Sequence, residues 1–269
     1  MDVVNQTNRR SSGRVIAVAN QKGGVGKTTT TINLATALAA TNKNVLIFDL
    51  DPQGNASTGL GVDRAARGQN SYHILIGEAE IDALTIPTSI PKLDIIPSGV
   101  DLSGAEVELV DMERREFQLK EALGRATAAY DYVLIDCPPS LTLLTINALV
   151  ASDAVLVPLQ CEFFALEGIS HLIKTIDRIK RGFNPALTIQ GIVLTMYDKR
   201  NNLSELVAAD VREYFGDTVY DTVIPRNVRI SEAPSHGRPV LVYDTNCAGS
   251  RAYIQLASEV LRRERKVAA

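Results

Sequence analysis

The stretch Asn20-Gln21-Lys22-Gly23-Gly24-Val25-Gly26-Lys27-Thr28-Thr29 lies between an apolar run, residues 15–19, and a helix-like run that continues through Leu38. Its three glycines permit backbone conformations that are closed to other residues, so that successive N–H groups can point at one oxyanion. A helix that starts near Lys27 adds its positive N-terminal end to these donors. The stretch therefore predicts a phosphate-binding loop.

The side chains of this loop have predicted parts in binding a nucleotide. Lys27 places a mobile positive charge at the β- and γ-phosphates, and the Thr28 hydroxyl is a natural Mg²⁺ ligand. In the common G-x-x-x-x-G-K-[ST] pattern a glycine stands five positions before Gly26, where this chain has Gln21. The loop is thus an irregular version of the pattern. Its predicted nucleotide-binding residues are Lys22, Gly23, Gly24, Val25, Gly26, Lys27, Thr28 and Thr29.

The irregular loop, with its second lysine near the start, resembles the deviant Walker A motif K-G-G-x-G-K-T-[TS]. Proteins with this motif include the ParA and MinD ATPases and the nitrogenase-type iron proteins. The resemblance implies ATP and Mg²⁺ as cofactors and ATP hydrolysis as the reaction. It also implies that Lys22 reaches across a nucleotide-sandwich dimer to the partner's phosphates, so both Lys22 and Lys27 are expected to be catalytic.

Two further apolar runs end in carboxylates. Asp49 and Asp51 follow residues 45–48, and Asp136 follows residues 132–135. Such runs are typical of buried parallel strands whose carboxyl ends open on a ligand crevice. There, one carboxylate helps to orient the Mg²⁺ shell while another positions or deprotonates the attacking water. The two stretches resemble the D-x-D-P-Q-G-N and I-D-C-P-P-S motifs of ParA proteins, which implies that Asp51 is the hydrolytic carboxylate. The expected metal-site residues are Thr28, Asp49 and Asp136.

The second half of the chain resembles the chromosomal ParA (Soj) branch of this family. Residues 162–168 are similar to a segment that lies near the ParA dimer interface, and residues 231–237 fit the Soj branch closely. By the same resemblance, Pro225 and Asn227 are expected to contact the adenine, and Arg200 and Arg229 to contact DNA. Without the resemblance, surface arginines beside carboxylates are the better interpretation of the last two.

Composition limits the remaining possibilities. The net charge of −3 gives no global attraction to nucleic acid, so any DNA contact must come from a local patch. The three cysteines, an odd number far apart in the sequence, argue against a disulfide framework and fit a reducing cytoplasm. No apolar stretch reaches the length of a membrane span, and the N-terminus lacks the apolar core of a signal peptide.

The alternation of apolar strands with helices predicts an α/β fold with a doubly wound, mainly parallel sheet, flanking helices and nucleotide at its carboxyl edge. No linker divides the chain, so we expect a mobile tail over residues 1–13 and one P-loop ATPase domain over residues 14–269. The charge-rich segment 104–129 is expected to be helical over most of its length.

The resemblance implies a ParA-type chromosome-partitioning ATPase. Its ATP-bound homodimer would bind double-stranded DNA without reading sequence, and a ParB-type partner would stimulate hydrolysis and release it from the nucleoid. A MinD-like membrane-surface switch is the first alternative, but the C-terminal segment 251–266 lacks an aromatic anchor and Glu264 interrupts its basic face. The second alternative is an iron–sulfur carrier, which needs paired cysteines at the dimer seam. A single cysteine beside a strand end, such as Cys137, is usually a small buried apolar residue instead.

Overall fold

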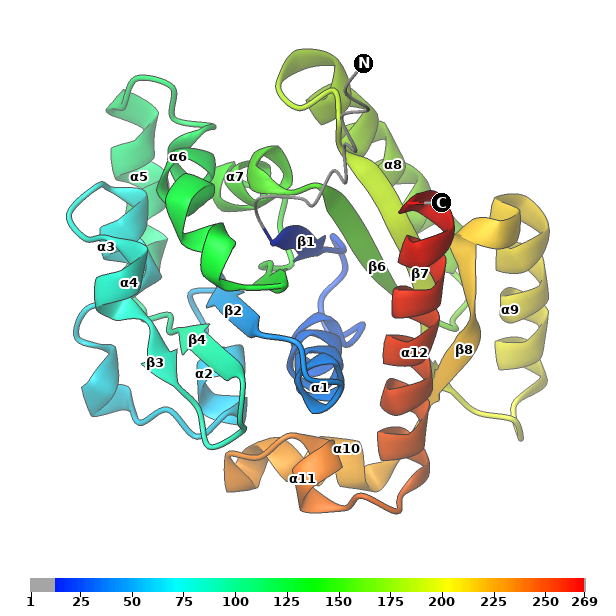
Figure 1. Cartoon of the computed structure of the whole chain (residues 1–269). Coiled ribbons are helices and arrows are strands. Elements are labelled where there is room, and N and C mark those ends of the chain that lie inside the picture. The colour runs from blue at the N-terminus through cyan, green and yellow to red at the C-terminus, as the bar shows by residue number, and fades with distance from the viewer. Residues whose placement is uncertain (1–12, 269) are drawn as a thin grey trace, which may run out of the picture.

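The computed structural model describes residues 13–268, which form one central sheet with helices on both faces (Figure 1). The sheet has eight strands in the order β3-β4-β2-β5-β1-β6-β7-β8. All neighbouring strands pair in parallel except β3, which runs antiparallel to β4 at one edge. The strands are β1 (Arg14–Val18), β2 (Val45–Asp49), β3 (Ile86–Pro87), β4 (Leu93–Ile96), β5 (Tyr132–Asp136), β6 (Ala154–Gln160), β7 (Thr188–Tyr197) and β8 (Val219–Pro225).

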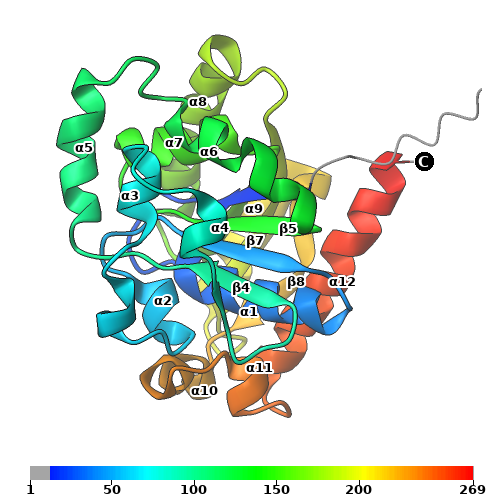
Figure 2. The ribbon, with the colours of Figure 1, turned by 60° about the vertical axis from the view of Figure 1, so that its left-hand side comes forward.

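The helices divide into two groups, one on each face of the sheet, as the turned view of Figure 2 also shows. One face carries α1 (Lys27–Ala40) and α12 (Ala248–Ala268), with α2 (Asn55–Gly59), α10 (Val228–Glu232) and α11 (Val240–Tyr243) beside them. The other face carries α3 (Ser71–Leu75), α4 (Ile81–Leu84), α5 (Leu102–Asp111), α6 (Gln118–Ala126), α7 (Leu143–Ala151), α8 (Ala165–Gly182) and α9 (Asn202–Phe215). Single turns of 3₁₀-helix complete the chain at Arg64–Arg67, Thr127–Ala129, Gly216–Thr218 and Ala233–His236.

The apolar strands form the core because both of their faces are covered. In β1, Val15 and Ala17 pack into the cluster under α5–α9, whereas Ile16 and Val18 pack into the cluster under α1 and α12. Successive side chains of a strand point to opposite faces, so a continuous apolar run such as β1 requires helices on both sides. The predicted doubly wound, mainly parallel fold is therefore confirmed.

The connections between the strands determine where a ligand can bind. β1 leads to β2 through α1 on one face, whereas β5, β6, β7 and β8 follow one another through α7, α8 and α9 on the other. Ligands of open α/β sheets bind where the connections change direction, outside the carboxyl ends of the strands. The phosphate-binding loop follows β1 at this point.

Residues 104–129 are helical over most of their length, as expected, but the helical part is divided. The chain turns between α5 and α6, where Arg114 has a φ of 52°. Asn147 of α7, fully buried, holds this break by accepting from Leu119 N at 3.1 Å and donating to Arg115 O at 2.8 Å. The predicted mobile tail lies outside the described residues apart from Gly13, whose N–H donates to Thr127 O at 2.8 Å.

Candidate nucleotide-binding site

The loop between β1 and α1 has the backbone that an anion requires. Gly24 and Gly26 have φ angles of 75° and 90°, in the left-handed region that favours glycine. Gly26 is the N-cap of α1, and no side chain there accepts a hydrogen bond from the first turn of the helix. The N–H groups of that turn are therefore free to donate to a phosphate, and the helix dipole favours negative charge at the same place.

Lys27 lies buried at the start of α1, with 6% of its surface exposed. Its Nζ donates to Lys22 O at 2.9 Å, across the mouth of the loop. Burial lowers the pKa of Lys27, and the nearby charge of Asp136 and, more weakly, of Asp51 opposes that shift. The structure therefore brings the lysine and these two predicted carboxylates into one electrostatic cluster.

Asp136, the last residue of β5, is fully buried beside α1. One carboxylate oxygen accepts from Thr31 Oγ1 at 3.0 Å, while the other, Oδ2, has no hydrogen-bond partner among residues 13–268. Burial, with Asp49 close by, raises the pKa of Asp136 to about 8, and the hydroxyl of Thr28 opposes this shift.

The donor set at Asp136 fits Mg²⁺. An unpaired buried carboxylate oxygen is costly, and a hydrated cation held by Thr28 would satisfy it. The described part of the chain contains no group of three or more His, Cys, Asp or Glu side chains that could hold a metal ion by themselves. Mg²⁺ does not need such a group, because it usually keeps several waters and binds through one or two carboxylates and the phosphates of a substrate.

Asp49 and Asp51 both lie at the end of β2, but their carboxylates have different hydrogen-bond partners. Asp49 is fully buried, and its carboxylate accepts from Ser57 N at 2.8 Å, Ser57 Oγ at 2.6 Å and Asp51 N at 3.3 Å. These contacts commit Asp49 to shaping the loop, so its predicted influence on a metal ion would be indirect. The Asp51 carboxylate accepts from Gln53 N at 3.0 Å and, 7% exposed, lies near Lys27 at the same sheet edge.

The second lysine of the loop has a partner that the sequence did not predict. Lys22 Nζ forms an ion pair with Glu162, which follows β6, and the Lys22 side chain remains 44% exposed. Its N–H donates to Asn20 Oδ1 at 3.0 Å. In the single chain, Lys22 is therefore held beside its own loop, at the rim of the site and accessible to solvent.

A cavity of about 370 Å³ adjoins the loop and contains both predicted adenine contacts. Pro225 and Asn227 line it together with Gly26 and Thr29, so the structure brings the end of β8 to the start of α1. Asn227 is also the N-cap of α10, because its side chain accepts from Arg229 N at 2.9 Å. The other lining residues are Thr195, Met196, Ile224, Arg226, Ile230, Ser231, Pro234 and Tyr253.

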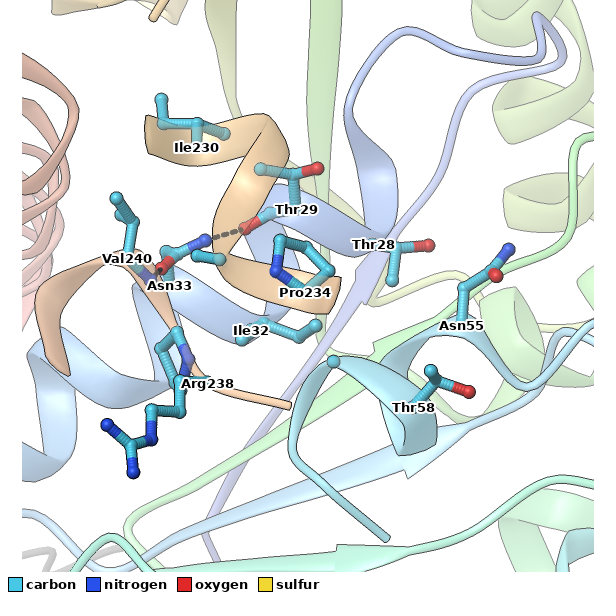
Figure 3. A pocket seen from close by; sticks show the side chains of 13 residues that line it. Thr28, Thr29, Ile32, Asn33, Asn55, Thr58, Ile230, Pro234, Arg238 and Val240 are labelled. Carbon is cyan, nitrogen blue, oxygen red and sulfur yellow. Dashed lines mark hydrogen bonds between the residues drawn. The ribbon is translucent and has the colours of Figure 1, made fainter. Parts of the chain in front are cut away.

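A second cavity, of about 270 Å³, lies beside Thr28 between α1, α2 and the segment around α10 and α11 (Figure 3). Asn33 of α1 fixes its wall, because its side chain donates to Thr29 O and accepts from Val240 N, both at 2.8 Å. Residues 230–240 thus border both cavities. No local sequence pattern predicts this contact, since Asn33 and Val240 are 207 residues apart.

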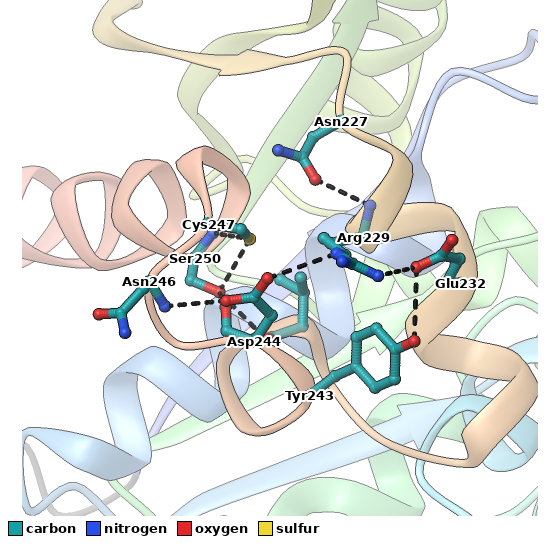
Figure 4. A network of polar contacts seen from close by, with 9 residues as sticks. Asn227, Arg229, Glu232, Tyr243, Asp244, Asn246, Cys247 and Ser250 are labelled. Carbon is teal, nitrogen blue, oxygen red and sulfur yellow. Dashed lines mark hydrogen bonds and ion pairs between the residues drawn. The ribbon is translucent and has the colours of Figure 1, made fainter.

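The two predicted DNA-contacting arginines are exposed, but each has carboxylate neighbours. Arg200, whose side chain is 87% exposed, pairs with Asp198 at 2.9 Å. Arg229 pairs with Glu232 at 2.8 Å and approaches Asp244 to 3.5 Å, and Figure 4 shows this network around α10. Neither arginine is therefore an uncompensated positive charge in the single chain.

The fold buries the apolar helix face that a membrane-surface switch would need and two of the cysteines that an iron–sulfur carrier would need. The apolar face of α12 is buried, with Tyr253, Leu256 and Val260 at most 1% exposed and packed in the cluster under α1. Cys137 and Cys161 are buried free cysteines, and burial raises the pKa of both thiols, that of Cys161 to about 11. Within residues 13–268, no helix is long and apolar enough to cross a membrane.

Comparisons with known proteins agree with the geometry. A family model described as an AAA domain matches residues 13–189. The chain is 62% identical to the chromosome partitioning protein ParA of Caulobacter vibrioides over 94% of its own length and 95% of the relative's. It is 52% identical to the sporulation initiation inhibitor protein Soj of Bacillus subtilis, over 92% and 98% of the two chains.

One solved structure similar to this chain contains a nucleotide and a metal ion. The Mycobacterium smegmatis protein described as cobyrinic acid a,c-diamide synthase, with bound ADP and magnesium, superimposes with a TM-score of 0.83 at 37% identity. The match covers 94% of this chain and 96% of that one. ATP and Mg²⁺, the cofactors expected from the loop, are thus consistent with both the donor set and the comparisons.

Proposed function

The chain belongs to the ParA/Soj family of Mg²⁺-dependent chromosome-partitioning ATPases, and we propose that it acts as a nucleotide-controlled DNA-binding switch. ATP joins two copies into a sandwich dimer, and the dimer binds double-stranded DNA without reading its sequence. A ParB-type partner stimulates hydrolysis, after which the dimer separates and leaves the DNA. The protein would accordingly work at the nucleoid in the cytoplasm.

The residues of the site have distinct parts in hydrolysis. The N–H groups of the loop and Lys27 Nζ bind the β- and γ-phosphates, and Thr28, with Asp136 through water, would hold the metal ion. Bound Mg²⁺ neutralises charge that develops on the phosphates. Asp51 orients the attacking water and accepts its proton as the new P–O bond forms and the bond to the ADP oxygen breaks.

The dimer is proposed because of the position of Lys22. Lys27 already supplies the buried charge inside the loop, whereas Lys22 lies at the exposed rim. If Lys22 leaves Glu162, its flexible stem and point charge suit it to reach a phosphate in a facing subunit. The pair with Glu162 involves two partly exposed side chains, and such pairs contribute only about 0–1 kcal/mol, so an exchange of partners costs little.

The observation that carries the link between nucleotide and DNA is the position of α10. This five-residue helix begins after Asn227, which lines the cavity beside the loop, and its second residue is Arg229. A base that contacts Asn227 therefore acts on the helix that presents Arg229. Since the chain has a net charge of −3, one patch would bind DNA weakly, but a dimer joins two patches and releases counterions from both.

Sedimentation of the wild type and of Lys22→Ala, each with ATP and Mg²⁺, tests the dimer. We expect the wild type to sediment as a dimer and the variant to bind ATP but remain a monomer. A normal ATP-dependent dimer of Lys22→Ala would contradict the role of this lysine. Pelleting with anionic liposomes in ATP would separate this function from a membrane-surface switch, which predicts co-sedimentation with the vesicles.

A further inference from the structure

A closed ring of four hydrogen bonds joins the carboxyl ends of β2 and β4. Asp51 N donates to Asp49 Oδ1 at 3.3 Å, and Ser57 Oγ donates to Asp49 Oδ2 at 2.6 Å. Ser98 N then donates to Ser57 Oγ at 3.0 Å, and Ser98 Oγ donates to Asp51 O at 2.7 Å. Asp49, Ser57 and Ser98 are fully buried and Asp51 is 7% exposed. The ring is therefore shielded from solvent.

The direction of each bond in the ring is determined. A serine hydroxyl has a single proton, and that of Ser57 goes to the Asp49 carboxylate, which leaves its oxygen to accept from Ser98 N. The proton of Ser98 goes to Asp51 O. Buried polar groups whose partners are all inside the protein hold one geometry, because breaking any one bond leaves a costly unpaired group.

The outer side of the same loop is fixed as well. Gly54 N donates to Asp51 O at 2.8 Å, and Arg67 donates to Gly54 O at 3.2 Å. Gly54 has a φ of 60°, and a Cβ there would lie 3.0 Å from Ser98 O. The turn after Asp51 thus lies directly against the end of β4, in a conformation that needs glycine.

The ring acts on the main chain of Asp51 rather than on its side chain. Ser98 and Gly54 hold the carbonyl oxygen of Asp51, and Asp49 holds its N–H. The carboxylate has a hydrogen bond only from Gln53 N among the described residues, at 3.0 Å. It is therefore held in place by its backbone, while it still has an oxygen that can accept from a water molecule.

We propose that Ser98 and Ser57 are positioning residues for hydrolysis, which hold the Asp51 carboxylate at the water that attacks the γ-phosphate. Neither serine lines the cavities beside the loop, so both act through Asp51 and not through the nucleotide. The inference rests on the proposed role of Asp51. A serine that only stabilised the fold would affect thermal stability and leave the turnover of the folded protein unchanged.

The test compares Ser98→Ala with wild type, Asp51→Ala and a matched control. Ser152→Ala is the control, because Ser152 is 3% exposed and its hydroxyl donates to Ala148 O at 2.7 Å. It lies just before the amino end of β6, whereas the ring lies at the carboxyl ends of the strands. We expect Ser98→Ala to lower kcat by about 10- to 100-fold, as displaced catalytic groups do, with KM for ATP within about 2-fold. Ser152→Ala should keep the wild-type kcat.

A second variant and a double variant complete the design. Ser57→Ala removes the bonds to Asp49 and from Ser98, so it should lower kcat in the same way and tests the ring if Ser98→Ala does not fold. In single-turnover hydrolysis with labelled ATP, Ser98→Ala should add no further loss to Asp51→Ala. Wild-type kcat in both serine variants, with an inactive Asp51→Ala, would overturn the positioning role. Wild-type turnover in Asp51→Ala would instead overturn the proposed role of Asp51.

Discussion

Glu232 limits the positive charge that α10 can offer to DNA, and its removal should strengthen DNA binding. Arg229 donates to Glu232 at 2.8 Å, and the two side chains are 52% and 39% exposed. A phosphate that binds Arg229 must compete with this carboxylate. We therefore predict that Glu232→Gln binds duplex DNA more tightly than the wild type in the presence of ATP and Mg²⁺.

The size of the effect follows from the exposure of the pair. Exposed ion pairs contribute about 0.2–1 kcal/mol each, and the proposed dimer has two copies, which gives about 0.4–2 kcal/mol in total. Since 1.4 kcal/mol is a factor of ten, we expect a gain in affinity of about 2- to 30-fold. Asp244, at 3.5 Å from Arg229, remains in the variant and keeps the effect from being larger.

Fluorescence anisotropy with a labelled duplex of arbitrary sequence, measured over a series of salt concentrations, would check this prediction. Glu121→Gln is the matched control. Glu121 lies on α6, on the other face of the sheet, and its replacement removes the same charge together with an ion pair to Arg114. Arg229→Ala should reduce the slope of log K against log salt by about 1.8, for two lost phosphate contacts per dimer. An unchanged slope in Arg229→Ala, or equal effects of the two glutamine variants, would refute the reasoning.

Three further predictions concern the proposed catalytic carboxylate, the loop and the sheet. Asp51→Ala should lower ATP turnover by about 10²- to 10⁴-fold, the usual contribution of a general base, and should leave the dimer trapped on DNA; rapid release from DNA would speak against this. Gly23→Val should bind nucleotide but remain a monomer in sedimentation with ATP. A Cβ at Gly23 has only Pro139 Cβ nearby, at 3.9 Å, so the single chain tolerates the added side chain, which would meet the second subunit of the dimer. Gly191→Ala should destabilise the fold by about 1–3 kcal/mol, because the added Cβ would lie 2.4 Å from the Tyr220 ring and overpack the core. Thermal unfolding would detect the loss of stability, and an unchanged Tm would contradict this packing.

The sequence predicted those parts of the fold and site that depend on local pattern. Continuous apolar runs marked the strands β2, β5 and β6, because strands covered on both faces need apolar residues at every position. The parallel arrangement then brought Lys27, Asp51 and Asp136 to one edge, as expected. The family and the cofactors followed from the loop motif and are confirmed.

Parts that depend on contacts between distant segments could not be predicted in this way. Residues 70–91 gave no clear pattern, since their elements, α3, α4 and β3, are each five residues or shorter and show no full period. The break before α6 depends on Asn147 from another helix. Ser98 acts on Asp51 across 47 positions, and nothing in its own sequence neighbourhood marks it as more than the end of a strand.

The central claim, a DNA-binding switch controlled by the nucleotide, is tested most directly by DNA affinity in different nucleotide states. Binding of the wild-type protein to an unrelated duplex would be measured with ATP and Mg²⁺, with ADP and Mg²⁺, and without nucleotide, at one salt concentration. The account predicts that the protein binds DNA only in the state with ATP and Mg²⁺, and that Arg229→Ala abolishes this binding. Arg178→Ala, which changes an exposed arginine of α8 on the other face of the sheet, should retain it. Equal affinity in all three states, or no binding in any, would contradict it.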